Sequence, residues 1–510
     1  MREIGYRYGA VKTLAELIRE GSGLRVHGDP GVPLAGLACD SRLVQPGFLF
    51  AALPGTAADG AQYIPDALGR GAVALLVPAG RTYNGYPVPV VESADPRREL
   101  ARMLAAFYDH PSGHLDLVGV TGTKGKTTTT YLTEAVLRAA GCRTGVVGTI
   151  AYRIGDEVLP ATHTTPDACA LQALLARMVA AGVTHAAMEV SSHALHQHRA
   201  DYLQFRVAVF TNLSRDHLDY HRDFTEYLEA KARLFVAPEL QPGGRPRLNV
   251  INSDDPAGRS LLPRCVGEVV TFGVAEPADY RAANIRLDAA GTTFDLQVPG
   301  GERREVRLPL VGSFNVHNAL AALAAGVGLG VPLDTALAAL AAAPAVRGRF
   351  ERVPWSAGPT VVVDYAHTPD SLEQALTNAR ALARGRLLVV FGCGGNRDTG
   401  KRPMMGEIAA RLADLAWVTS DNPRKEDPLT IIEHILAGIP DQARQHCRVE
   451  PDRAQAITEA IAEGREGDLV LVAGKGHEDY QIFADRTIHF DDAEVARAAL
   501  ARLHPIPEAG

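Results

Sequence analysis

The feature that most constrains this chain is an apolar run that breaks into a glycine-rich loop ending in Gly-Lys-Thr, at residues 117–129. The apolar part predicts a buried strand, and the residues from Thr127 onward predict a helix. In that setting Gly122 and Gly125 let backbone N–H groups surround phosphate oxygens. Lys126 can then reach the outer phosphates, and the Thr127 hydroxyl can hold Mg²⁺. The segment therefore predicts a nucleotide-binding α/β domain.

The spacing of this loop differs from that of the common P-loop, which has a glycine five positions before the glycine of its Gly-Lys pair. Val120 occupies that position here, and the nearest glycine before Gly125 is Gly122, so the loop is two residues shorter. A glycine turn with a solvated lysine is the alternative interpretation, but the strand–loop–helix context favours phosphate binding.

Length and composition limit the class of protein. At 510 residues the chain is too long for one hydrophobic core, and we expect about three domains. Hydrophobic residues make up 46% and charged residues 22% of it, which is ordinary for a globular protein. A net charge of −7 offers no electrostatic attraction for nucleic acid, so we expect no nucleic-acid partner.

Cysteine usage and hydropathy predict where the protein works. The six cysteines stand singly without a Cys-x-x-Cys pair, which argues against a zinc site and a disulfide scaffold and is typical of a reducing cytoplasm. The first residues contain no apolar segment of a signal peptide, and no apolar run reaches bilayer length. We therefore expect a cytoplasmic protein without membrane insertion, and we expect a monomer.

Strand-like and helical segments divide the chain into three predicted domains. Residues 1–110 carry short apolar runs separated by Gly and Pro turns, typical of a small α/β domain. In residues 111–344 apolar strands alternate with helices, which predicts a mostly parallel sheet with helices on both faces. Residues 345–510 repeat that rhythm. Ligands bind such sheets at the carboxyl ends of the strands, and polar clusters follow the strands here.

The apolar runs also predict the bounds of individual elements in the second and third parts of the chain. The predicted helices lie at 168–181 and 225–236. The predicted strands lie at 144–150, 184–190, 206–211, 360–364, 386–391, 415–419 and 468–473.

Polar residues at two neighbouring strand ends suit a metal site. Glu189 ends an apolar run, and beside a phosphate loop its carboxylate suits Mg²⁺ together with Thr127. An exposed strand-end glutamate is the alternative, which the nearby loop disfavours. His217 follows the next strand and is a candidate for a second divalent ion. Lys231 by itself has the pattern of a solvated helix lysine.

Four strand-end loops mark the third part of the chain. Asp364 ends an apolar run and either accepts ribose hydroxyls or caps a turn, and the residues alone leave both open. The loops at 392–398, 421–424 and 474–478 combine glycines, two arginine forks and Glu478. Arginine forks bind carboxylates and a glutamate balances an ammonium, so these loops describe an amino-acid pocket better than a nucleotide pocket.

Taken in order, these motifs resemble those of the Mur ligases, and most closely the MurE group, whose members add the third amino acid of the peptidoglycan stem peptide. The resemblance extends over nearly the whole chain. One departure is Lys124, where loops of this family usually carry Asn; a loop that binds through its backbone tolerates that change. The motifs that carry the resemblance are Asp40-Ser-Arg42, Thr121-Gly-Thr-Lys-Gly-Lys-Thr-Thr128, Glu189-Val-Ser-Ser-His193, Thr211-Asn-Leu-Ser-Arg-Asp-His-Leu-Asp219, Lys231, Gly312-Ser-Phe-Asn-Val-His-Asn-Ala319, Gly348-Arg349, Asp364-Tyr-Ala-His367, Asp421-Asn-Pro-Arg424 and Gly474-Lys-Gly-His-Glu-Asp-Tyr-Gln481.

The resemblance implies a fold and a reaction. The fold would consist of a UDP-binding N-terminal domain, a central ATPase-like domain and a C-terminal Rossmann-like domain. ATP, with Mg²⁺, would phosphorylate the terminal carboxylate of UDP-MurNAc-L-Ala-D-Glu. The amine of a diamino acid would attack the acyl phosphate, and the tetrahedral intermediate would collapse to an amide. Lys126 and Mg²⁺ would stabilise the transferred phosphoryl group. Such a reaction serves cell-wall synthesis and, through it, cell shape and division.

The resemblance also implies residue roles. The catalytic residues would be Lys126, Glu189, His217 and Lys231. The metal ligands would be Thr127, Glu189, His217 and Lys231, the last as a carbamylated lysine. The ATP contacts would be Gly122, Thr123, Lys124, Gly125, Lys126, Thr127, Thr128, Asn315, Asn318, Arg349 and Asp364. The substrate contacts would be Cys39, Ser41, Thr56, Ala57, Ala58, Thr164, Thr165, Ser191, Gln197, Arg199, Arg397, Asp421, Asn422, Pro423, Arg424, Gly474 and Glu478.

Within the substrate set, Ser41 and residues 56–58 would meet the uridine end, and the residues from Thr164 to Arg199 would line the muramoyl dipeptide. The set from Arg397 to Glu478 would form the amino-acid pocket. Its Asp-Asn-Pro-Arg motif resembles the form of the enzyme that adds meso-diaminopimelate, whose extra carboxylate gives the extra guanidinium of Arg424 a reason.

Several alternatives stay open at this point. L-Ornithine or L-lysine could replace diaminopimelate. A nucleotide switch or motor would share the loop but predicts no amino-acid pocket. A folylpolyglutamate synthetase would share the loop and the chemistry but gives no reason for the N-terminal domain. A catalytically dead homologue should have lost Lys126, Glu189 or Lys231, and all three are present.

Overall fold

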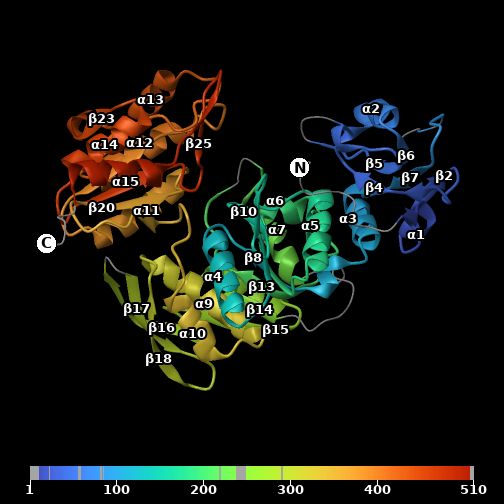
Figure 1. Cartoon of the computed structure of the whole chain (residues 1–510), viewed down its shortest axis with the longest axis horizontal. Coiled ribbons are helices and arrows are strands. Elements are labelled where there is room, and N and C mark those ends of the chain that lie inside the picture. The colour runs from blue at the N-terminus through green and yellow to red at the C-terminus, as the bar shows by residue number, and fades with distance from the viewer. Residues whose placement is uncertain are drawn as a thin grey trace. The chain divides into compact units, whose positions relative to one another are not determined.

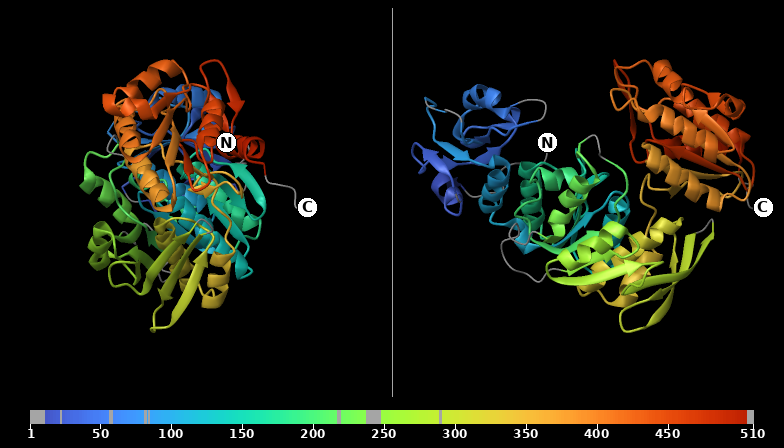
Figure 2. Two further views of the ribbon diagram at one scale, coloured as in Figure 1. Left: turned by 90° about the vertical axis from the view of Figure 1, so that its left-hand side faces the viewer. Right: turned by 180° about the vertical axis from the view of Figure 1, so that it is seen from behind.

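The computed structural model describes residues 11–505 except 22, 56–58, 81–82, 84, 217–219, 237–247 and 289–290. The chain forms two compact units (Figure 1, Figure 2). The first contains residues 1–281 and 317–339, and the second contains residues 282–316 and 340–510.

The first unit begins with a small sheet in the order β2-β7-β6-β5-β4. Its strand β5 is apolar, and every residue of it is buried. The short strands β1 and β3 form a separate antiparallel pair. The bounds are Lys12–Thr13 for β1, Arg25–His27 for β2, Pro33–Leu34 for β3, Gly36–Ala38 for β4, Phe48–Ala51 for β5, Ala72–Pro78 for β6 and Val90–Ser93 for β7, with helices α1 at Leu14–Ile18, α2 at Ile64–Gly69 and α3 at Pro96–Phe107.

The larger sheet of the first unit has the order β11-β10-β9-β12-β8-β13-β14-β15, and the start of β16 pairs with β15. The strands from β9 to β15 in that order run parallel. The carboxyl end of β8, where the glycine loop begins, therefore lies between the ends of β12 and β13. The bounds are Asp116–Thr121 for β8, Thr144–Val147 for β9, Ala151–Ile154 for β10, Glu157–Pro160 for β11, His185–Glu189 for β12, Phe205–Phe210 for β13, Leu248–Asn252 for β14, Glu268–Gly273 for β15 and Tyr280–Asp288 for β16.

Helices connect these strands, as parallel pairing requires. α4 follows the glycine loop, and α5 begins at the N-cap Asp167, whose side chain accepts a hydrogen bond from Ala170 N–H. The bounds are Lys126–Ala139 for α4, Ala168–Ala180 for α5, Ser192–His196 for α6, Phe224–Val236 for α7, Pro256–Leu261 for α8, Ser313–Gly328 for α9 and Leu333–Ala341 for α10. In the second unit β17, Gly291–Gln297, pairs antiparallel with β18, Arg303–Leu308.

The C-terminal part of the second unit forms a six-stranded sheet with the strand order β19-β20-β24-β21-β22-β23. Alternate residues of its strands enter two separate cores: Val389 packs with α11, α12 and α13, whereas Val390 packs with α14 and α15. Burial on both faces is what parallel sheets require. The bounds are Glu351–Arg352 for β19, Thr360–Asp364 for β20, Leu387–Phe391 for β21, Leu415–Val418 for β22, Cys447–Val449 for β23, Leu469–Ala473 for β24, Tyr480–Ile482 for β25, Thr487–His489 for β26, Pro369–Leu382 for α11, Lys401–Leu412 for α12, Pro428–Leu436 for α13, Arg453–Glu463 for α14 and Asp492–Leu503 for α15.

The predicted α/β class with a parallel central sheet is confirmed. The strand predicted at 360–364 has those bounds, whereas the strand predicted at 144–150 ends at Val147. Among the described residues, no helix is both long and apolar enough to span a membrane.

Candidate active site

The glycine loop between β8 and α4 needs its two glycines for space as well as for conformation. Gly122 has φ 149° and Gly125 has φ 84°. A Cβ on Gly122 would lie 1.9 Å from Thr211 Oγ1, and one on Gly125 would lie 2.4 Å from Asn318 Oδ1. No side chain fits at either position, so backbone N–H groups line the start of α4, where the helix dipole favours an anion.

The loop is held in place by the end of β13. Asn212 Oδ1 accepts a hydrogen bond from Lys124 N–H at 2.9 Å, and Lys124 O accepts one from Thr211 Oγ1 at 2.6 Å. The N–H of Thr123 donates to Asn212 O at 2.8 Å. These bonds use the backbone of Lys124, so a side chain other than Asn at this position leaves them unchanged.

Two lysines converge on one carbonyl oxygen of the loop. Lys126 Nζ donates to Gly122 O and to Thr123 O, each at 2.9 Å, and Lys231 Nζ donates to Gly122 O at 2.8 Å. Lys231 is 1% exposed and its Nζ lies 4.5 Å from the centre of the Tyr227 ring. Burial, and then the charge of Lys126, hold the pKa of Lys231 well below its usual range. The sequence pattern of Lys231 is that of a solvated helix lysine, but in the structure Lys231 is a buried amine that contacts the glycine loop.

The carboxylate of Glu189, at the end of β12, faces the start of α4. Its Oε2 accepts hydrogen bonds from Thr127 Oγ1 at 2.9 Å and from Thr149 Oγ1 at 3.2 Å, and its Oε1 accepts one from Thr149 N–H at 2.7 Å. Glu189 is 1% exposed, so the alternative of an exposed strand-end glutamate is wrong. Thr127 and Glu189 bring together the hard oxygen donors that Mg²⁺ prefers.

The residues predicted to line the dipeptide form a connected group beside Glu189. Thr165 Oγ1 donates to Glu189 O at 2.8 Å and accepts from Ser191 N–H at 3.1 Å. Thr164 Oγ1 lies 3.0 Å from Thr149 Oγ1. Through this chain of bonds the carboxylate and the predicted dipeptide residues share one edge of the sheet.

Arg199 extends this group. Its Nη1 donates to Thr165 O at 3.2 Å, and its Nε donates to Gln197 Oε1 at 3.0 Å. Burial lowers the pKa of Arg199 while the nearby Asp167 raises it. A half-buried guanidinium beside neutral partners is suited to an anionic substrate group.

Sequence reasoning gave no role to Thr149 or Tyr220. Thr149 lies in the segment predicted as strand, but β9 ends at Val147 and Thr149 turns its N–H and hydroxyl to Glu189. Tyr220 OH lies 3.0 Å from Gln197 Nε2 and 2.8 Å from His196 Nδ1. The only signal for Tyr220 was its place in the polar run after β13.

The uridine-end residues are described only in part. Thr56, Ala57 and Ala58 lie outside the described residues, and so does His217, the predicted second metal ligand. Ser41 is buried at the start of a short 3₁₀ helix, where its hydrogen bond is the main cause of the lowered pKa of Asp66. Cys39 Sγ lies 3.7 Å from Cys169 Sγ.

The second unit brings three of the predicted loops together because β24, β21 and β22 are neighbours in its sheet. Asn422 Nδ2 donates to Glu478 Oε2 at 2.7 Å. Arg424 has φ 55°, and its Nη1 donates to Gly395 O at 3.0 Å. A Cβ on Gly474, which has φ 122°, would lie 2.7 Å from Asp421 Oδ2. These contacts bring the loops at 392–398, 421–424 and 474–478 together, as expected for the predicted amino-acid pocket.

Two further residues predicted for this pocket, Arg397 and Pro423, lie beside Gly394 and Gly395. Arg397 is exposed, and its Cγ lies 3.8 Å from the Cβ position of Gly394, with Arg424 Nη1 2.8 Å from the same position. Pro423 is buried, and its carbonyl oxygen lies 1.9 Å from the Cβ position of Gly395. Gly395 therefore lets the backbones of the two loops approach, and Gly394 leaves room for the Arg424 guanidinium.

The loop at 474–478 contributes a buried lysine, Lys475, to which sequence reasoning gave no role. Lys475 has no exposed side-chain surface, and its Nζ lies 3.3 Å from Glu478 Oε2 and 3.3 Å from Asn422 Oδ1. Burial raises the pKa of Glu478, and the charge of Lys475 opposes that effect. The signal for Lys475 was its place between two glycines directly after a buried strand.

Three predicted ATP contacts belong to the second unit. Asp364 Oδ2 accepts from Phe350 N–H at 2.7 Å, and the Arg349 guanidinium lies 4.9 Å from the centre of the Tyr365 ring. Asn315 Nδ2 donates to Val311 O at 2.9 Å. Another predicted ATP contact, Asn318, lies in the first unit, and its Oδ1 is 3.4 Å from Thr129 Oγ1.

Three family descriptions together match most of the chain. Residues 33–108 match the description "Mur ligase family, catalytic domain", residues 120–326 match "Mur ligase middle domain", and residues 348–476 match "Mur ligase, glutamate ligase domain".

Two relatives carry the name UDP-N-acetylmuramoyl-L-alanyl-D-glutamate–2,6-diaminopimelate ligase. The protein of Geobacillus kaustophilus is 46% identical over 488 residues, which cover 96% of this chain and 99% of the relative. The protein of Thermosynechococcus vestitus is 50% identical over 462 residues, which cover 89% and 91%.

Two solved structures show the same fold. A UDP-N-acetylmuramoyl-L-alanyl-D-glutamate–2,6-diaminopimelate ligase is 34% identical and has a TM-score of 0.69 over 97% of this chain and 99% of its own. The MurF ligase of Thermotoga maritima in complex with ADP is 19% identical, covers 91% of this chain and 97% of its own, and has a TM-score of 0.58.

Proposed function

This chain belongs to the Mur ligase family, and we propose that it is an ATP-dependent amide-bond ligase that adds meso-diaminopimelate to UDP-MurNAc-L-Ala-D-Glu. The resemblance seen in its motifs is thereby confirmed at the level of the family. The proposed activity is supported by similarity, at 34% identity or more and over most of the chain, to proteins named as this ligase. The reaction belongs to the synthesis of peptidoglycan precursors.

The glycine loop would bind the phosphates of ATP. Backbone N–H groups at the start of α4 would hold phosphate oxygens, and Lys126 would exchange its bonds to loop carbonyls for the transferred phosphoryl group. A carboxylate becomes an electrophile once one of its oxygens has been phosphorylated, since phosphate is then the leaving group. Arg199 and Thr165 would position the dipeptide for this step.

Thr127, Glu189 and Lys231 would hold Mg²⁺. The first two offer oxygen donors 2.9 Å apart, and Lys231 would supply carboxylate oxygens after carbamylation. A bound Mg²⁺ would neutralise charge on the phosphates. His217 keeps its predicted role as a ligand of a second ion. We expect Lys231 to take up a labelled carboxyl group from isotopically labelled bicarbonate, measured by intact mass, and a Lys231→Met variant not to do so.

The pocket of the second unit would bind the incoming amino acid. Arg424 and Arg397 would bind carboxylates, while Glu478 and Asn422 would accept an ammonium. A pocket with both signs of charge suits a zwitterion that carries an additional carboxylate, which favours diaminopimelate over ornithine or lysine.

We further propose that the chain is divided into a UDP-binding domain at 1–110, an ATP-binding domain at 111–344 and an amino-acid-binding domain at 345–510, and that it acts as a monomer. The loop around Ser41 and the residues at 56–58 would meet the uridine end of the substrate.

Phosphate release measured with UDP-MurNAc-L-Ala-D-Glu, ATP and each of three amino acids tests the proposal. We expect release that depends on diaminopimelate and on the dipeptide substrate, with little release in the presence of ornithine or lysine. Release that needs no amino acid would instead support a nucleotide hydrolase. Release with lysine or ornithine alone would keep the ligase and replace its third amino acid.

A further inference from the structure

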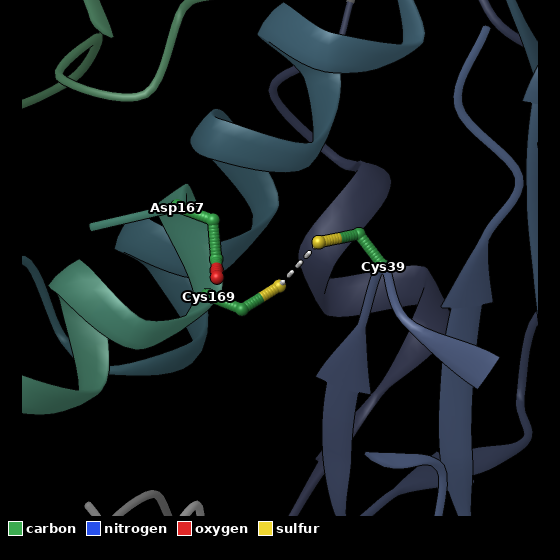
Figure 3. A group of neighbouring side chains, drawn as sticks. All are labelled: Cys39, Asp167 and Cys169. Carbon is green, nitrogen blue, oxygen red and sulfur yellow. Dashed lines mark hydrogen bonds between the residues drawn. The ribbon is translucent and has the colours of Figure 1, made fainter. Parts of the chain in front are cut away.

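Two cysteines that stand far apart in the sequence meet in the first unit. Cys39 directly follows β4 of the small sheet, and Cys169 lies in the first turn of α5. Their Sγ atoms are 3.7 Å apart, although 130 positions separate the residues in the chain (Figure 3). The pair is a contact between side chains that point toward each other from different elements (Figure 3).

The two thiols are not equivalent. Cys169 is 2% exposed, whereas Cys39 is partly exposed. The S–H of Cys169 donates to Cys39 Sγ. That hydrogen bond, together with burial, raises the pKa of Cys169 well above its usual range. Cys39 is thus the sulfur that an oxidant can reach, and Cys169 is the neighbouring thiol that can complete the reaction.

A metal ion is the alternative ligand for this cluster because Asp167 lies next to the sulfurs. One carboxylate oxygen of Asp167 and the two Sγ atoms lie within 4.8 Å of one another. However, Asp167 Oδ1 already accepts the Ala170 N–H at 3.0 Å as the N-cap of α5. Two sulfurs and a carboxylate engaged in capping fall short of the four ligands of a structural zinc site, so the geometry favours reaction between the sulfurs.

We propose that Cys39 and Cys169 form a reversible disulfide when the protein meets a low-molecular-weight disulfide such as oxidised glutathione. The Cys39 thiolate attacks one sulfur of the oxidant, forms a mixed disulfide and releases one thiolate, which takes up a proton. The Cys169 thiol then gives up its proton, and its sulfur attacks Cys39 Sγ and releases the second small thiol. The two cysteines lose two electrons, and the oxidant gains them.

The disulfide would act on the binding of the UDP substrate, a consequence that rests on the proposed function. Cys39 and Ser41 flank Asp40, and Cys169 lies two residues after Asp167, which influences the pKa of Arg199. Closing the sulfurs from 3.7 Å to a bond of about 2.05 Å moves one or both segments by ~1.7 Å. A shift of that size at substrate contacts is large enough to weaken the binding of the substrate.

The first test is chemical and does not depend on activity. The folded, full-length protein is incubated with oxidised glutathione, and intact mass and peptide mapping are measured before and after reduction. We expect a loss of two hydrogen atoms and a cross-linked peptide that joins Cys39 to Cys169. Cys169→Ala should stop at a mixed disulfide on Cys39, and Cys39→Ser should give no cross-link.

Cys447→Ser is the matched control, since Cys447 is another partly buried cysteine and lies in the second unit. This variant should form the cross-link like the unchanged protein. A cross-link absent from the unchanged protein, or formed by other cysteines, would overturn the proposal. Zinc that copurifies in a one-to-one ratio and is lost in both Cys39→Ser and Cys169→Ala would overturn it in favour of a metal site.

The second test measures the KM for the UDP substrate and the KM for ATP in the oxidised and reduced protein. We expect the oxidised protein to show a KM for the UDP substrate about tenfold higher, an unchanged KM for ATP, and recovery on reduction. Cys169→Ala should be active and, under reducing conditions, should have the KM of the reduced unchanged protein. A cross-link without a change in KM would overturn the effect on substrate binding, and amino-acid-independent phosphate release would overturn the proposed function while leaving the mass result intact.

Discussion

The glycine loop of the first unit and the proposed amino-acid pocket of the second unit both lie at the carboxyl ends of parallel strands, but they are constructed differently. In the glycine loop, the lysines donate to main-chain carbonyls and Glu189 accepts from hydroxyl and N–H groups. In the proposed pocket, side chains contact one another: the Lys475 ammonium and the neutral Asn422 amide both donate to Glu478 Oε2.

The difference teaches how each site is specified. The glycine loop is a continuous segment whose shape follows from two glycines that cannot carry a Cβ. The pocket depends on three loops that only the strand order brings together. Substitution of single residues in the glycine loop should therefore impair that site. The proposed pocket should also be impaired by substitution of residues that hold its strands in place.

The anchoring role is sharpest at the buried ion pair of Arg453 and Asp492. Neither side chain is exposed, and Arg453 Nη2 also donates to Ala473 O at 3.0 Å, next to the pocket. We expect Arg453→Met to lower the free energy of unfolding of the second unit by about 3–5 kcal/mol, because it leaves the Asp492 charge unpaired. Chemical denaturation measures this loss.

The double variant Arg453→Met/Asp492→Leu serves as the control for that change, and it should recover much of the lost stability because no buried charge is left. A single variant as stable as the unchanged protein would mean that the pocket does not depend on this anchor.

The loop side of the comparison is tested by Lys126→Ala. We expect kcat to fall by roughly 100- to 1000-fold, because the side chain would stabilise the charge that develops during phosphoryl transfer. Arg138→Ala, which removes a cation from the last turn of the same helix, is the control and should keep its kcat. An unchanged kcat in Lys126→Ala would contradict the role given to the loop.

Arg424 tests the pocket itself. We expect Arg424→Ala to raise the KM for diaminopimelate by roughly 30-fold, which corresponds to about 2 kcal/mol, and to leave the KM for ATP unchanged. Steady-state kinetics with each substrate varied in turn measures both. Arg424→Lys should recover only part of the loss because an ammonium cannot replace the planar fork. An unchanged KM for the amino acid would remove Arg424 from the pocket.

The smallest effect concerns pH and His477, in the loop after β24. Burial, and then the charge of Arg349, lower the pKa of His477 from its usual 6.5 to about 3. Between these values the unfolded chain binds a proton that the folded chain does not, so the free energy of unfolding falls as pH drops from about 6.5 to about 3.

A His477→Gln variant should lose less stability than the unchanged protein over that range, as measured by denaturation at several pH values. His489→Gln is the control, because His489 is exposed and its pKa is raised by Glu494. Equal pH dependence in His477→Gln and the unchanged protein would contradict the assignment.

The parts of the fold that the sequence predicted are those where apolar runs end in polar loops. The strand at 360–364 and the helix at 168–181 were predicted to within a residue at either end. β18 carried no such signal, because most of its residues are exposed and four of its six are charged, so it has the composition of a loop. Pairing with β17 makes it a strand.

The site shows the same limit. Glycine spacing and the resemblance pointed to the loop and to Glu189, because these signals lie within single segments. The bond between Thr149 and Glu189 joins residues 40 positions apart, and the contact of Cys39 with Cys169 spans 130 positions. No local sequence pattern predicts contacts between residues so far apart in the chain, because these contacts follow from the order of strands and the packing of helices.

The two cores of the C-terminal sheet have a consequence for how that sheet is aligned. A one-residue slip normally exposes the apolar face of a strand, but a strand such as β21 is apolar on both faces, so a slip would only exchange one core for the other. Alignment must then come from the strand ends, where Gly474 N–H donates to Asp364 O and Thr419 N–H donates to Phe391 O. The loops that we assign to ligand binding therefore also set the register of the sheet, and substitutions there should be read for misalignment as well as for lost contacts.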